Sequence, residues 1–283
     1  MAITVLPSDL VRDARALRAD LSLYWWLLGA QVRSQMQYRA SFALQTLGQA
    51  LSTFVDFVAL LLLFHRFPTL AGWSLGEVAF LYGLGGIAFA FADMLCGGFD
   101  RLSETIRLGT FDRVLTRPVG AFLQTLAGDF QIRRLGRIAQ AAGALAIALA
   151  WVEIDWTPAR LLVAVAALLS GVVIFAAIWV IGAAVTFWTV ETSQMTNSFT
   201  YGGSELVGHP MNIYADWLRR FFTFIVPLAF VTYLPALYIL DRPDPLGLPR
   251  VLQFCSPLVA AAFFLAARAA WDLGVRHYQS TGS

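Results

Sequence analysis

Asp56 lies deep within a long apolar stretch near the start of the chain, where a carboxylate is energetically costly. It shares one helical face with three other polar residues at intervals of four, three and four: Gln45, Gln49 and Ser52. Such a face must point toward protein or water. We expect Gln49, Thr53 and Asp56 to line a polar pathway, with Asp56 as a cation site or ion partner. The alternative is a buried carboxyl, protonated or hydrogen-bonded to a neighbouring helix.

The motifs that would indicate an enzyme are missing from the sequence. A phosphate-binding loop needs a lysine, and every basic residue here is arginine apart from three histidines. Those histidines, His65, His209 and His277, have no metal-binding spacing, and Cys96 and Cys255 form no paired motif. We therefore expect no catalytic, cofactor or metal site on this chain. Evidence on the function must then come from the apolar stretches and from the segments that connect them.

Composition and hydropathy predict an all-α polytopic membrane protein. Of the 283 residues, 58% are hydrophobic and only 13% charged, whereas soluble domains carry about a quarter charged residues. Apolar stretches of this length are comfortable only in lipid. The six predicted transmembrane helices are Ala40–Phe64, Leu75–Leu95, Leu135–Trp151, Leu161–Trp188, Leu218–Leu240 and Val251–Trp271.

The arginines predict the orientation of these helices. Sixteen of the twenty fall in alternate gaps, on the same side as both termini. Because positive charge accumulates on the cytoplasmic side, we expect both termini inside the cell. Residues 1–39 would form a cytoplasmic segment with an interfacial helix, 40–271 the membrane domain and 272–283 a cytoplasmic tail. The amphipathic helix expected at Asp9–Leu28 would lie on the inner leaflet or pack on a soluble partner.

The gap between the second and third stretches carries the most specific pattern. We call residues 99–121 the knuckle, because they predict two short helices joined by a turn. Leu102, Ile106 and Leu108 can cover one side of the first helix. Gly109 can end it with a left-handed cap, and Pro118 stops the helix that follows. A knuckle with a hydrophobic tip ringed by arginines could insert into a groove on a soluble partner. It could also be an ordinary hydrated loop.

The knuckle resembles the coupling region of ABC-2 type permeases, specifically the six-span export family. Residues 37–40 and 210–236 agree with that family in order and spacing. The resemblance implies an exporter in which two permeases, identical or related, join two copies of a separate ATPase that binds ATP and magnesium. It also implies a coupling role for eight knuckle residues: Ile106, Arg107, Gly109, Phe111, Asp112, Leu115, Arg117 and Pro118.

Three further expectations concern the helix ends. Asp93, near the inner end of the second span, should pair with a knuckle arginine. Pro227 and Pro235 should kink or break the fifth span. The polar segment 191–220 should form a helical connection on the inner side, either as a second contact to the ATPase or as a surface segment without a partner.

The sequence thus predicts a permease subunit of an ATP-driven exporter in a bacterial inner membrane. Its partners would be the bilayer, the ATPase, a second permease and a transported substrate, with no nucleic acid. Asp56 favours a cation or an amphiphile as substrate. An energy-independent channel or carrier is the alternative. A membrane enzyme acting on lipids would need clustered acids, histidines or metal ligands, which the sequence lacks.

Overall fold

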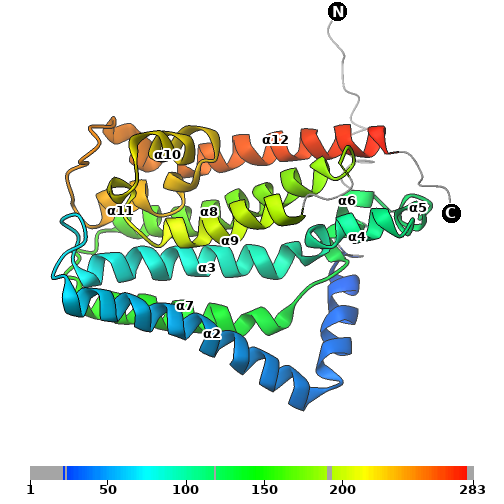
Figure 1. Ribbon diagram of the computed structural model, residues 1–283, viewed down its shortest axis with the longest axis horizontal. Helices are drawn as coiled ribbons and strands as arrows, with labels where there is room; N and C mark the ends of the chain where they lie inside the picture. The colour runs from blue at the N-terminus through cyan, green and yellow to red at the C-terminus, as the bar shows by residue number, and fades with distance from the viewer. Residues whose placement is uncertain (1–21, 23, 118, 190–192, 279–283) are drawn as a thin grey trace, which may run out of the picture.

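The computed structural model describes residues 22, 24–117, 119–189 and 193–278. Within these ranges the fold is all-α, without a β-strand, and the long helices run side by side (Figure 1). The elements are α2 (Arg39–Arg66), α3 (Leu75–Asp100), α4 (Leu102–Arg107), α5 (Phe111–Leu115), α6 (Ala121–Ala127), η1 (Ile132–Arg134), α7 (Leu135–Trp151), α8 (Pro158–Val185), α9 (Ser193–Val207), η2 (Met211–Ile213), α10 (Asp216–Arg220), η3 (Phe221–Ile225), η4 (Leu228–Phe230), α11 (Tyr233–Ile239), η5 (Arg250–Phe254) and α12 (Ser256–His277).

Local sequence signals explain where the long helices begin. Ser74 caps α3 through a capping box, in which its hydroxyl accepts from the Glu77 backbone and the Glu77 carboxylate accepts from the Ser74 backbone. Thr157 caps α8, and Pro158 occupies the first helical position. These caps fix the helix starts at one end of the bundle.

Five of the six predicted spans coincide with long helices: α2, α3, α7, α8 and α12. Among the described residues, α2, α3, α8 and α12 are long and apolar enough to cross a membrane. Helix α7 has the predicted bounds, but its 17 residues rise only about 26 Å, slightly less than a hydrocarbon core of about 30 Å. The count of six spans therefore remains a prediction.

Helix α3 is the central helix of the bundle. It packs on α7 and α8 along its length, and most of its residues are buried. Close approach depends on glycine: a Cβ on Gly83 would lie 2.7 Å from the backbone of Leu145 in α7. By contrast, α2 packs mainly on α7, and its outer face exposes large apolar side chains such as Leu44 and Leu62. That face is suited to lipid or to another membrane chain.

The fifth predicted span, Leu218–Leu240, differs from a simple transmembrane helix. It is split at Val226 and Pro227 into two helical pieces bent by 74°. The expected break at Pro227 is therefore present. Proline removes a backbone donor and clashes with the preceding turn, which accounts for a break at this point.

Both ends of this bent pair lie near the connection between α2 and α3. The Asn212 amide, just before the pair, donates to the Ala71 carbonyl. Arg242, just after it, donates to the Gly72 carbonyl. Between them the pair reaches into the body, where Leu228 packs against Gly203 of α9. The segment therefore enters and leaves at one end of the bundle, and we call residues 216–239 the hairpin.

The polar segment expected on the inner side instead contains α9, which runs through the body. Its first turn packs on α8, where Thr196 meets Gly182, and its last residue, Val207, lies beside Gly85 of α3. Figure 1 shows α9 lying between α8 and α3. Residues 190–192 lie outside the described ranges. The placement of the whole segment 191–220 at one end is therefore corrected: its described part runs along α9 from the knuckle end to the hairpin end.

This arrangement divides the connections between two ends of the bundle. The hairpin end carries the α2–α3 connection, the α7–α8 connection and the segment after α9. The knuckle end carries the knuckle, the start of α7 and the end of α12. Arg219 lies close enough to Tyr233 to interact with it electrostatically, and Tyr233 packs on Trp73 of the α2–α3 connection. Arg219 and Arg220 thus move to the hairpin end. Among the described residues this leaves eleven arginines at the knuckle end and six at the hairpin end.

Residues 24–36 form a helix that crosses the knuckle end at a steep angle to the bundle (Figure 1). Gln31 and Gln35 donate from this helix to the carbonyls of Gly128 and Phe130. Trp25 and Trp26 are largely exposed, as suits residues that settle at lipid headgroups. Most of the amphipathic helix expected at Asp9–Leu28 lies outside the described residues.

Candidate functional site

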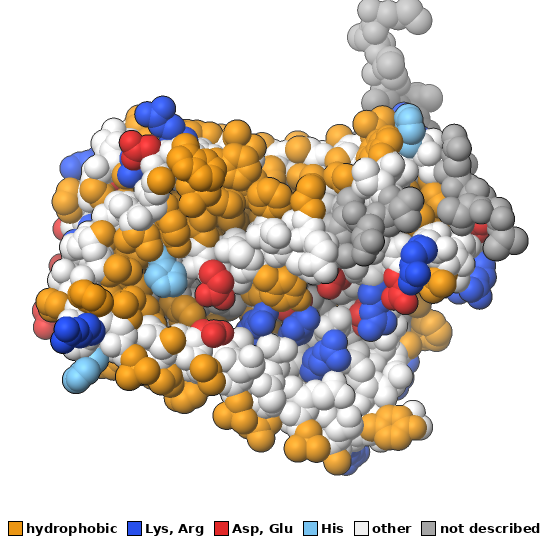
Figure 2. Space-filling view, viewed as in Figure 1, with side chains coloured by type: hydrophobic (Ala, Val, Ile, Leu, Met, Phe, Trp, Pro, Cys, Tyr) orange, Lys and Arg blue, Asp and Glu red, His pale blue; other side chains and the backbone are white. Residues whose placement is uncertain are grey.

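A cleft with a volume of about 310 Å³ lies among α2, α3, α7 and α9. Figure 2 shows acidic and basic side chains gathered in a hollow on this face of the molecule. Polar and charged groups at this depth need a hydrated surface or a protein partner. The lining residues are Thr53, Asp56, Tyr82, Gly86, Phe89, Arg137, Gln140, Ala141, Tyr201, Gly202, Ser204 and Glu205.

The three predicted pathway residues lie at or next to this cleft. Thr53 and Asp56 line it. Thr53 is buried, and its hydroxyl donates a hydrogen bond to the Gln49 carbonyl at 3.1 Å. Asp56 is exposed. Gln49 does not line the cleft. Its side-chain oxygen accepts a hydrogen bond from Arg134, on the knuckle side of the cleft. Their part in conducting a substrate stays a prediction.

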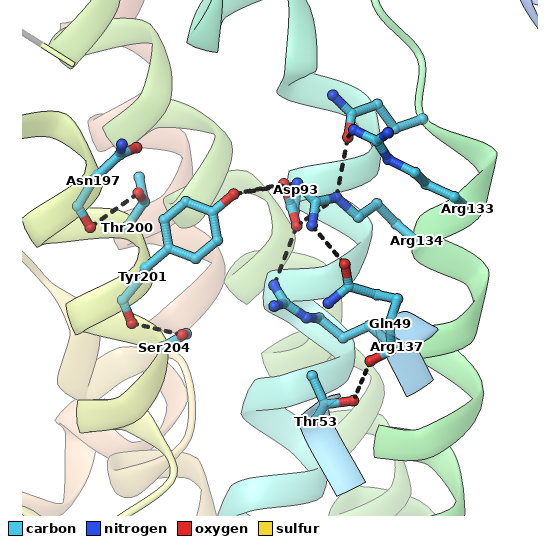
Figure 3. A network of polar contacts seen from close by, with 11 residues as sticks. Gln49, Thr53, Asp93, Arg133, Arg134, Arg137, Asn197, Thr200, Tyr201 and Ser204 are labelled. Carbon is cyan, nitrogen blue, oxygen red and sulfur yellow. Dashed lines mark hydrogen bonds and ion pairs between the residues drawn. The ribbon is translucent and has the colours of Figure 1, made fainter. Parts of the chain in front are cut away.

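Asp93 forms the centre of a buried ion-pair network on the knuckle side of the cleft (Figure 3). Its Oδ2 lies 3.0 Å from Nε of Arg134 and 3.2 Å from Nη1 of Arg137. The expected arginine partner is present, but it comes from η1 and α7 rather than from the knuckle. The three-residue interval between Arg134 and Arg137 places both on one helical face. That spacing is the sequence signal that could have identified the pair.

The network joins four helices. Arg134 donates to Gln49 of α2 at 3.1 Å and to the Tyr201 hydroxyl of α9 at 3.3 Å. Tyr201 in turn donates to Asp93 of α3 at 3.5 Å. The Arg137 guanidinium lies 5.1 Å from the Phe89 ring centroid. Since removing one member of a buried ion pair leaves an uncompensated charge, the network fixes these helices together at the knuckle side of the cleft.

Several lining residues were not identified from the sequence. Glu205 and Tyr201 lie on α9. The polar composition of this helix predicts a connection on the inner side. Tyr82 lies on α3 and donates its hydroxyl to the Thr53 carbonyl at 3.0 Å. Each comes from a different position along the chain, so only the packing of α9 against α3 reveals that they share a cleft.

The knuckle has the predicted turn. Gly109 adopts a φ of +65°, the left-handed conformation that ends α4. The Thr110 amide donates to the Thr105 carbonyl, which completes the cap. Leu102 and Ile106 are buried as expected, but Leu108 is exposed.

Phe111 anchors the knuckle to the membrane helices and is not part of its exposed tip. Its side chain is fully buried, with ring centroids 5.4 Å from Phe187, after α8, and 5.0 Å from Tyr278, after α12. The Tyr278 hydroxyl donates to Asp112 at 2.9 Å. Burial and this bond raise the pKa of Tyr278 to about 12, because both favour the neutral hydroxyl.

An aromatic cluster extends this anchor. Phe99 at the end of α3 and Phe122 of α6 both meet Trp271 of α12, with centroid distances of 5.2 and 5.7 Å. Phe187 meets the same tryptophan at 5.5 Å. The knuckle is therefore packed against the ends of α3, α8 and α12.

The remaining predicted coupling residues fall into two groups, those exposed on the knuckle surface and those buried beneath it. Arg107, Leu115 and Arg117 are exposed around the knuckle. Ile106 is buried and Gly109 is partly exposed at the turn. Pro118 lies outside the described residues. The exposed members are available to a partner, whereas Ile106 and Phe111 support the knuckle from inside.

The sequence matches the family described as ABC-2 family transporter protein over residues 50–282. Neither a curated protein nor a solved structure matches the chain. The family match covers the cleft, the ion-pair network, the knuckle and the hairpin, and it agrees with the long apolar helices of a multi-pass membrane protein. The chain therefore belongs to the ABC-2 family of transporter proteins.

Proposed function

We propose that this chain is the permease subunit of an ATP-driven exporter, coupled through its knuckle to a separate ATPase chain. Two permeases, identical or related, would combine with two ATPase copies in a bacterial inner membrane, with the knuckle end in the cytoplasm. The excess of arginine at that end supports this orientation. Hydrolysis would alternate the cleft between inward-facing and outward-facing states.

The observation that carries the proposal is the construction of the knuckle. A short helical unit with exposed Arg107, Leu115 and Arg117 is joined rigidly, through Phe111, to the ends of the membrane helices. An apolar side chain ringed by arginines suits an acidic groove with an apolar floor on a soluble partner. Movement of that partner would then be transmitted through the aromatic cluster toward the cleft.

The test should use the exposed residues, because truncating the buried Phe111 would damage the knuckle itself. Arg107→Glu and Arg117→Glu reverse charge at the tip, and Arg66→Glu makes the same change at the hairpin end. In the complex reconstituted with its cognate ATPase, we expect each tip variant to lower permease-dependent ATP hydrolysis by about tenfold and to weaken co-purification. The Arg66 variant should match the wild type.

Wild-type association and hydrolysis in both tip variants would contradict the proposal. Vesicle assays address the channel or carrier alternative. Substrate movement by the purified permease at the same rate without ATPase and ATP would favour that alternative, whereas movement that requires both supports the exporter.

A further inference from the structure

Two acidic side chains line the part of the cleft nearer the hairpin end: Asp56 from α2 and Glu205 from α9. They interact with each other electrostatically. In the described part of the chain, neither carboxylate has an ion pair or a hydrogen-bond donor. Asp56 lies ten residues before the end of α2, which is about 15 Å along the helix. Two carboxylates that line the same cleft and have no partner of their own favour a positively charged ligand.

Arg137 lines the cleft and interacts electrostatically with Glu205, but its guanidinium group is bound on the knuckle side. Arg137 is paired with Asp93 and packed between the rings of Phe89 and Tyr201, at 5.1 and 5.8 Å. Arg134 is held by the same carboxylate. Gln49, which accepts from Arg134, precedes Asp56 by seven residues, so the network lies about 10 Å along α2 from the Asp56 carboxylate.

Around the cleft, the carboxylates outnumber the guanidinium groups by one. Asp56, Glu205 and Asp93 face Arg134 and Arg137. The other titratable groups near the two carboxylates are His209 and the hydroxyls of Tyr82 and Tyr201. The hairpin side of the cleft is thus acidic, and its knuckle side is neutralised.

The cleft also provides aromatic surface beside the acids. Tyr82 interacts electrostatically with Asp56 and Glu205, and its ring lies in the cleft wall, 5.6 Å from the Phe57 ring. Aromatic faces next to carboxylates favour organic cations, whose apolar groups can pack on the ring while the charge is neutralised. A bare metal ion fits less well, because no cluster of three ligating side chains occurs among the described residues.

We propose that this part of the cleft binds a lipophilic organic cation, held by Asp56 and Glu205 and packed on Tyr82. The volume of about 310 Å³ accommodates a small amphiphile. The inference rests on the proposed function, since it names the class of substrate that the exporter would carry. It adds Glu205 as a specificity-determining residue that turns a single carboxylate into a two-acid site.

Equilibrium binding of tetraphenylphosphonium to the permease alone tests this site, with purified protein in lipid nanodiscs and empty nanodiscs as the blank. Tetraphenylborate, of the same shape and opposite charge, serves as the competitor. We expect saturable binding of the cation that the anion does not displace. Asp56→Asn and Glu205→Gln should each weaken binding by at least about tenfold. Asp155→Asn and Glu153→Gln, in the α7–α8 connection, are matched controls that should leave it unchanged.

Binding no stronger than to empty nanodiscs, or wild-type affinity in both cleft variants, would overturn the proposal, as would equal displacement by tetraphenylborate. Asp56→Glu keeps the charge and should retain most of the affinity, which separates loss of charge from loss of fold. The assay omits the ATPase, so it can fail while the Arg107 and Arg117 variants still lose hydrolysis. That result would remove the cation site and leave the exporter intact.

Discussion

Helix α9 and the hairpin differ in composition and in depth within the bundle, and the more polar of the two lies deeper. Residues 193–207 are rich in Ser, Thr, Asn, Gln and Gly, yet α9 runs through the body beside α3 and α8. Residues 216–239 are far more apolar, yet the chain turns back at Val226 and Pro227 and returns to the end where it entered. The polar segment penetrates further along the bundle than the apolar one.

The difference shows that hydropathy reports contact with lipid and says little about depth within a bundle. Thr196 and Thr200 of α9 are buried, and the Thr200 hydroxyl donates within the helix to the Thr196 carbonyl. The small side chains and Gly203 let neighbouring elements approach closely. The hairpin needs apolar side chains because it has outward faces, with Phe224 and Ile225 largely exposed.

The largest expected effect is an all-or-none change in labelling side. In a Cys255→Ala background, with the buried Cys96 retained, a cysteine at the exposed Ala215 tests the segment after α9. A membrane-impermeant thiol reagent should reach Ala215→Cys from the same side as Thr69→Cys, in the α2–α3 connection. It should reach Thr116→Cys, in the knuckle, only from the opposite side.

Labelling of Ala215→Cys together with Thr116→Cys would contradict the path of α9 through the body. It would instead restore the placement predicted from hydropathy.

A smaller effect is expected from adding volume where α9 meets α8. A Cβ on Gly182 would lie 2.3 Å from Oγ1 of Thr196 and 2.9 Å from its Cβ, so Gly182→Val forces the helices apart. Overpacking of this kind costs about 1–3 kcal/mol. We expect a lower thermal unfolding midpoint in detergent and a lower yield of monodisperse protein.

The control for Gly182→Val lies on α9 itself. A Cβ on Gly202 would have no neighbour within 4 Å, so Gly202→Ala should raise stability by about 0.5–1 kcal/mol through helix propensity. Unfolding midpoints that change alike in the two variants would show that α9 is not packed against α8.

The smallest effect concerns the hydrogen bond that joins the two regions. Thr232 of the hairpin is fully buried and donates to the Val207 carbonyl at 2.7 Å. That carbonyl ends α9 and has no partner within the helix. Thr232→Val keeps the shape and leaves the carbonyl unpaired, so the free energy of unfolding should fall by about 1 kcal/mol.

Thr116→Val, which removes a local bond on the exposed knuckle surface, should cause almost no change in the same denaturant titration. Equal effects of the Thr232 and Thr116 variants would show that the hairpin is not held by α9.

Much of the fold was predictable because lipid-facing helices leave a strong signal. The bounds of α7 coincide with the predicted stretch, and the start of α3 at Leu75 agrees with its capping box. The left-handed Gly109 was predictable because few other residues adopt that conformation cheaply. The site was only partly predictable: Asp56 and Thr53 came from one helical face, but Glu205 and the arginine partners of Asp93 required knowledge of which helices meet.

The sequence by itself determined an all-α membrane chain, the asymmetry of its arginines and a short capped knuckle, because periodicity, charge and turn chemistry are local properties. The tertiary structure decided that α9 enters the bundle, that the hairpin turns back, and that Phe111 supports the knuckle from within. These outcomes depend on packing between segments far apart in the chain: an apolar face can be covered by lipid or by protein, and composition does not distinguish the two.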